Sequence, residues 1–211
     1  MKSVLALVAA AAVSVPALVL GAAPETMSTF TRGKAAAALL ESYVEGSCEY
    51  TNFSVNAADT ISKQTSGAPE VYEQQVMVSF RQNHCDGSES SGFVMLPLST
   101  KLSMGGYAIS LDLPVEHYTK SYAGDDVIYT HLDSHVLHAA ITLRGQGSAT
   151  RETTVQSDHV GGLFYRYYSN GVSRAASVSA TVSLDGTPLT FTSASGLLSN
   201  ESEGYVAVIR Q

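Results

Sequence analysis

The chain has 211 residues, of which 45% are hydrophobic, and it carries a formal net charge of −7 at neutral pH. Because polyanions are bound through dense groups of Lys and Arg and this sequence contains no Lys/Arg run, we expect no nucleic-acid partner. The length suits one large domain with a substantial core.

The N-terminus has the pattern of an export signal. Met1-Lys2 precedes an uncharged apolar stretch that ends near Gly21, Ala22 and Ala23, whose small side chains suit a cleavage site. We predict a signal peptide over residues 1–23, a secreted or cell-envelope exterior location, and no membrane span after cleavage. An uncleaved anchor is the alternative, since the stretch is long enough to cross a bilayer.

The mature chain is predicted to begin with a tether and to continue as one β domain. Residues 24–34 mix Pro, Thr, Ser and Gly without a period, which favours a tether. Residues 35–211 then form the single domain. A short helix is expected over residues 35–43, where Ala and Leu predominate.

Beyond that point the apolar residues alternate with a period of two, as in half-buried strands. The clearest runs begin at Phe53, Val76, Tyr107, Leu137, Val178 and Tyr205. Asn170-Gly171 and Asp185-Gly186 predict tight hairpin turns. With about ten strands and no helices of crossover length between them, an antiparallel β-sandwich is the first choice of fold and a closed β-barrel the second.

Cys48 and Cys85 are the two cysteines of the sequence. Exported proteins meet an oxidising environment, so a disulfide between these residues is expected.

The sharpest cluster of chemistry-bearing residues lies between His131 and His138. If one strand runs through it, His131, Asp133 and His135 share a face, and His138 follows shortly after. Such a set offers ligands for zinc or another transition metal. A bulge near Asp133 would scatter the side chains, and a polar strand face is the alternative interpretation. Apart from this ion, no cofactor is expected.

Two further regions are candidate binding surfaces. Tyr165 and Tyr167 alternate on one strand face and offer aromatic rings to a protein or carbohydrate partner. Glu116, His117 and Tyr118 lie in residues 114–126, which have no period and are predicted to form a long loop.

No nucleophile elbow or phosphate-binding glycine motif occurs, so no enzyme is identified by motif. Three hypotheses follow: a secreted non-enzymatic β domain that binds a partner, a metal-binding protein or metal-dependent enzyme that uses residues 131–138, and a structural component of the envelope.

Overall fold

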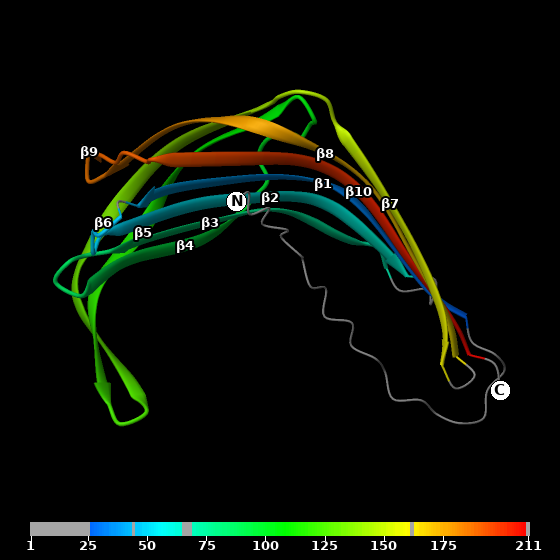
Figure 1. Ribbon diagram of the computed structural model, residues 1–211, viewed down its shortest axis with the longest axis horizontal. Helices are drawn as coiled ribbons and strands as arrows, with labels where there is room; N and C mark the ends of the chain where they lie inside the picture. Colours follow the sequence, from blue (N-terminus) through cyan, green and yellow to red (C-terminus); the bar gives the residue numbers. More distant parts are fainter. Residues whose placement is uncertain (1–25, 44, 65–68, 161–162, 210–211) are drawn as a thin grey trace.

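The computed structural model describes residues 26–43, 45–64, 69–160 and 163–209 (Figure 1). The predicted signal peptide and its cleavage site lie outside these residues. The described strands are β1 (Thr26–Tyr43), β2 (Tyr50–Gln64), β3 (Val71–Asn83), β4 (Ser88–Pro97), β5 (Gly106–Ala123), β6 (Asp126–Gly145), β7 (Thr150–Val160), β8 (Leu163–Leu184), β9 (Thr187–Pro188) and β10 (Ser193–Ile209).

The ten strands belong to one sheet in the order β10-β1-β2-β3-β4-β5-β6-β8-β7, with β9 paired to β8. β8 is 22 residues long and spans two neighbourhoods: residues 163–176 pair with β10, and residues 176–184 pair with β6. The pairings therefore run from β10 through the first six strands to β8 and back to β10. Because the path returns to its first strand, the sheet is ring-like. Each of these pairings is antiparallel.

The predicted all-β fold with about ten antiparallel strands and one disulfide is confirmed. The strands form one continuous sheet, whereas a sandwich would have two separate sheets. The sheet still provides two layers, because it curves until β5 and β6 cross the face of β1, β2 and β3 (Figure 1). The apolar faces predicted from the period of two therefore meet each other inside one sheet.

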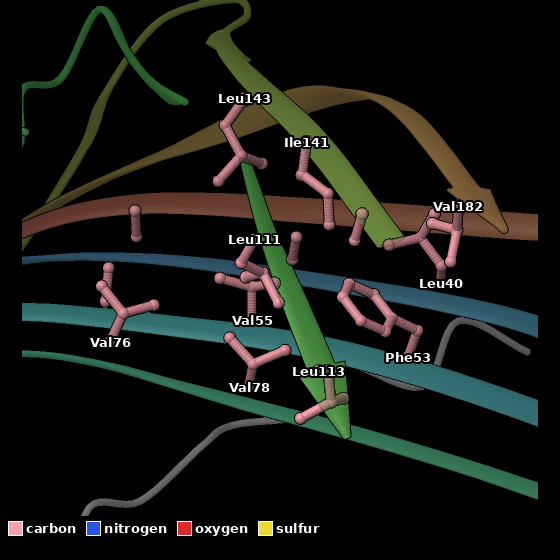
Figure 2. Packing of buried hydrophobic residues seen from close by; sticks show 14 of the residues in the cluster. Leu40, Phe53, Val55, Val76, Val78, Leu111, Leu113, Ile141, Leu143 and Val182 are labelled. Atoms are coloured by element: carbon pink, nitrogen blue, oxygen red, sulfur yellow. The ribbon is translucent and has the colours of Figure 1, made fainter. Parts of the chain in front are cut away.

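The core lies between these two layers. Figure 2 shows β5 crossing the other layer, with Leu111 and Leu113 close to Val55 and Val78 of β2 and β3. Phe53, Val55, Val78 and Leu113 are fully buried or nearly so. At about 25 cal/mol per Å² of apolar surface, each such side chain contributes about 2 kcal/mol through removal from water.

The disulfide lies at one end of this core. Cys48 follows β1 and Cys85 follows β3, so the bond joins the β1–β2 connection to the β3–β4 connection, with 5.0 Å between the two Cα atoms. The bond is that of a protein folded in an oxidising environment. The histidine group described below lies at the same end.

The beginning of the domain differs from the sequence-based expectation. Residues 26–34, assigned to a tether, form the first half of β1, and residues 35–43 continue that strand in place of a helix. The helical prediction is wrong because burial outweighs local propensity. Ala36, Ala38 and Leu40 alternate into the core at exposures of 1–3%, while β1 pairs with β2 and β10 along its edges.

Of the two predicted tight turns, one is confirmed and the other is wrong. Asp185-Gly186 forms the β8–β9 turn, and both residues have positive φ angles of 47° and 82°. Asn170-Gly171 is not a turn, because it lies inside β8 between β7 and β10.

The predicted loop over residues 114–126 is wrong as well. Its first ten residues, 114–123, complete β5, which then turns at Gly124 into β6. Pro114 is tolerated within the strand because β4 pairs with β5 only from Glu116 onward, which leaves the edge at Pro114 without a ladder bond to make.

The sheet divides into two regions, which we name the body and the wing. The body is the part in which β5 and β6 cover the other strands. The wing is the continuation of the sheet away from them, toward the C label in Figure 1. It consists of residues 26–34 of β1, 59–64 of β2, 71–75 of β3, 150–160 of β7, 163–173 of β8 and 199–209 of β10.

Candidate metal centre

The predicted His/Asp cluster lies in β6, and the strand contains an irregularity at this point. His117 pairs with Asp133, and the next residue, Tyr118, pairs with His131, so Leu132 is an extra residue in β6. This is the β-bulge considered in the sequence analysis. On its C-terminal side, Asp133 and His135 continue the parity of Leu137 and face inward at the end of the core.

His117 completes a three-residue group with Asp133 and His135. One ligand atom from each residue can be chosen so that all three lie within 4.8 Å of one another. The Nδ1 atom of His117 is 2.8 Å from Oδ1 of Asp133, and the Nε2 atom of His135 is 3.0 Å from the same oxygen. Two imidazoles and one carboxylate therefore converge from neighbouring strands on one small volume.

The second nitrogen of each imidazole is already anchored. Nε2 of His117 lies 2.9 Å from Oγ of Ser88 on β4, and Nδ1 of His135 lies 2.6 Å from Oδ2 of Asp185. Asp185 is itself fixed, because its other oxygen accepts a hydrogen bond from the backbone N–H of Val136 at 2.8 Å. Partners of this kind orient histidine ligands in metal sites and select the nitrogen that faces the ion.

The charges of the group follow from these contacts. The hydrogen bond with His117 lowers the pKa of Asp133, and the bond from the Val136 N–H lowers the pKa of Asp185, so both groups are carboxylates at neutral pH. The hydrogen bond with Asp185 raises the pKa of His135. Two carboxylates therefore surround His135, an arrangement that favours a cation at this position.

The other two predicted ligands do not join this group. His131 Nε2 is 2.7 Å from Oε2 of Glu116, and Ser134 donates a hydrogen bond to the same oxygen. His138 Nδ1 is 2.6 Å from Oδ1 of Asp112. Both imidazoles are more than half exposed, and each contacts a separate carboxylate across the β5–β6 ladder.

The remaining predicted surface residues are not members of the metal candidate. Tyr118 is held by Glu89, which accepts its hydroxyl hydrogen bond at 2.6 Å. Tyr165 stacks on Tyr205 with ring centroids 6.1 Å apart, and it shares with Tyr167 one face of the wing. The tyrosine surface and the histidine group therefore belong to different regions of the molecule.

Ser88 contacts His117, and His117 contacts Asp133, so the three side chains are linked in the same sequence as the Ser-His-Asp triad of a serine hydrolase. Two observations oppose that role. Ser88 is 2% exposed, and its hydroxyl already donates to Asp86 at 2.6 Å. We therefore assign Ser88 to the positioning of His117.

Sequence reasoning placed Asp133 and His135 in one group but assigned His117 to a separate loop. A signal for its position does exist, since a hairpin turn at Gly124-Asp125 folds residue 117 back onto residues 132–133. The contributions of Ser88 and Asp185 depend on the sheet order and have no comparable local signal.

Comparison with known proteins gives no family. No protein-family model matches the sequence, and no curated protein matches it either. Among the described residues, no helix has the length and apolar character needed to cross a membrane.

Proposed function

We propose that this domain binds one divalent transition-metal ion, zinc first, through His117, Asp133 and His135. The observation that supports it is the combination of convergence and anchoring: one nitrogen of each imidazole contacts the Asp133 carboxylate, while the opposite nitrogens are held by Ser88 and Asp185. A merely polar strand surface has no need of such orientation.

The ligand chemistry favours a borderline metal. Two imidazole nitrogens and one carboxylate oxygen suit zinc and its transition-metal neighbours, whereas calcium and magnesium prefer sets made of oxygen atoms. Zinc also needs no reducing environment, and the Cys48–Cys85 disulfide is that of an oxidising one. Three protein ligands leave one tetrahedral position for water or for a ligand from outside.

The side chains would need only small movements to hold an ion. The atoms now bond to one another at 2.8–3.0 Å, and metal–ligand distances are about 2.0–2.2 Å. Asp133 is 59% exposed, so its side chain has room to withdraw while the ion enters between the rings.

The test is a zinc titration by calorimetry of chelator-treated protein purified without a polyhistidine tag. The wild-type protein should bind one equivalent. His117→Ala and His135→Ala should each weaken binding by at least about 100-fold because each removes a ligand, and Asp185→Asn should weaken it by about 10- to 100-fold because it removes only an anchor.

The chain offers matched controls in His131→Ala and His138→Ala. Both remove an imidazole from the same strand but from outside the group, so zinc affinity should be unchanged. Loss of binding in these variants, with retention in His117→Ala, would assign the ion to residues 131–138 as a linear motif and contradict the site proposed. Absence of zinc, copper, iron and nickel binding to the wild-type protein would refute metal binding altogether.

A further inference from the structure

The wing is a sheet whose two faces are both exposed. Tyr72 and Val155 lie on one face at exposures of 60% and 57%, and Val71 and Val160 lie on the other at 55% and 60%. Sheets normally bury at least one face against another layer. The wing therefore exposes apolar side chains in the way expected of a surface that binds a partner.

One wing face is basic. Side chains alternate across a strand, and β1, β2, β7, β8 and β10 pair here without register shifts, so the face that continues from the core can be followed outward residue by residue. We call it the core-side face. Its cations are Arg32, Lys34, Lys63, Arg151 and Arg166.

Two described acids adjoin this face, and both already contact a neighbouring side chain of the same copy. Asp59 accepts a hydrogen bond from Gln74, and Glu70 pairs with Lys63 at 3.2 Å. Arg32, Arg151 and Arg166 are exposed. The core-side face therefore keeps a positive excess in a chain whose net charge is −7.

The opposite face of the wing, the outer face, is acidic. Its acids are Glu73, Glu152, Asp158, Glu201 and Glu203. No Lys or Arg occurs on this face among the described residues of the wing. Tyr165, Tyr167 and Tyr205 lie on it as well, so aromatic surface accompanies the negative charge.

The size of the wing suits a specific interface. Six strands about 4.8 Å apart, with nine residues of about 3.3 Å each, give a face of about 29 by 30 Å, or about 850 Å². A standard stable interface buries about 800 Å² on each partner. Packing two such faces at about 10 Å is also the ordinary geometry of sheet on sheet.

We propose that the wing binds a second copy of this chain, with the core-side face of one copy packed on the outer face of the next. The two faces have opposite charge, similar area, and aromatic or aliphatic side chains beside the charged ones. The core-side face carries five cations against the two acids that adjoin it, and the outer face of a second copy would present five acids to it, so the two faces are complementary in the sign of their charge.

The two surfaces in this contact are different, so the contact is head-to-tail and each copy keeps one unused face. Assemblies of this type close into rings or continue as open chains. Salt should weaken the contact, because it screens the attraction between the oppositely charged faces.

The experiment is sedimentation velocity over a concentration series at about 50 mM and about 500 mM salt. The wild-type chain should form species larger than a monomer at low salt and dissociate at high salt. Arg32→Gln with Arg166→Gln, the basic-face variant, and Glu201→Gln with Glu203→Gln, the acidic-face variant, should each sediment as monomers. Thermal melts would establish that both variants remain folded.

Mixing the two variants gives the decisive measurement. The intact outer face of the basic-face variant can bind the intact core-side face of the acidic-face variant, and the neutralised faces then prevent further growth. The expected product is a 1:1 pair and nothing larger. Lys101→Gln with Arg144→Gln and Asp125→Asn with Asp126→Asn remove the same charges elsewhere and should leave assembly unchanged.

Three outcomes would overturn the inference. A wild-type chain that stays monomeric at all concentrations and both salt levels has no such contact. Assembly that survives in both wing variants uses another surface. A monomer that binds a polyuronate or single-stranded DNA through Arg32 and Arg166 has an external polyanion as its partner in place of a second copy.

Discussion

The body and the wing share β1, β2, β3, β8 and β10, yet the two regions differ in composition. In β1, the residues that face the core are Ala36, Ala38 and Leu40, and the same face continues into the wing as Lys34 and Arg32. The backbone does not change at this boundary, since the pairing of β1 with β2 and β10 is continuous. What ends is the covering layer of β5 and β6.

The difference teaches that a second layer, and not strand geometry, selects the apolar side chains in this sheet. Strands persist in the wing through ladder hydrogen bonds and cross-strand pairs, such as Thr31 with Ser62 at 3.0 Å. Stability should therefore be concentrated in the body. Three experiments test this distribution.

The largest effect is expected from a phenylalanine pair on adjacent strands. Phe53 of β2 is fully buried, whereas Phe30 of β1 is 36% exposed in the wing. Phe53→Ala should lower the free energy of unfolding by about 4 kcal/mol, and Phe30→Ala by less than about 1 kcal/mol. Urea denaturation of both variants provides the comparison. Equal losses would show that the wing carries as much packing energy as the body.

The second-largest loss of stability is expected from removal of the disulfide. Replacing both Cys48 and Cys85 by Ala should lower the free energy of unfolding by about 3 kcal/mol, because the unfolded chain regains the freedom of a 37-residue loop. Calorimetry at one protein concentration would measure it. Since the bond lies in the body, amide exchange in β7 should be unaltered, and faster exchange there would contradict the separation of the two regions.

The smallest of the three concerns a buried carboxylate of the body. Glu89 is 10% exposed and contacts Lys120, Arg81 and Tyr118. Burial would raise the pKa of Glu89, but these partners outweigh it and the pKa is lowered below 4.5. Glu89→Gln should cost about 2 kcal/mol at neutral pH.

The pH dependence of this loss follows from the sign of the shift. A lowered folded-state pKa gives stability that is present above the unfolded-state value of 4.5 and is lost as pH falls through the folded-state value. The gap between wild type and Glu89→Gln should therefore close in acid. Urea midpoints measured between pH 7 and about pH 3 would show it, and a gap that stays constant would mean that the carboxylate charge is not what stabilises the site.

The division into body and wing explains which strands could be predicted from the sequence. Runs such as Val76-Val78-Phe80 identify strands because one face is buried, and all such runs lie in described strands. Residues 26–34 and 150–160 have no apolar period, because both faces of the wing are exposed. Their composition therefore resembles that of a tether, and only pairing with neighbours distant in sequence makes them strands.

Prediction of the candidate site was limited in a similar way. The spacing of Asp133 and His135 places two side chains on one face, which follows from local geometry alone. His117 joins them only once the register of the β5–β6 hairpin and its bulge are known. Asp185 is 50 residues from His135 in sequence, and its position depends on the β8–β9 turn next to β6.

The pairing of β1 with β10 has a consequence for how the molecule is made. Thr26 pairs with Val208 and Glu41 with Ser193. One edge of β1, the first described strand, therefore stays unpaired until β10, the last one, has been synthesised. Synthesis proceeds from the N-terminus, and contacts between residues so distant in sequence slow folding. Until that partner emerges, β1 offers an open edge to any other strand nearby. The nascent chain therefore carries a period of vulnerability to mispairing that ends only when β10 has left the ribosome.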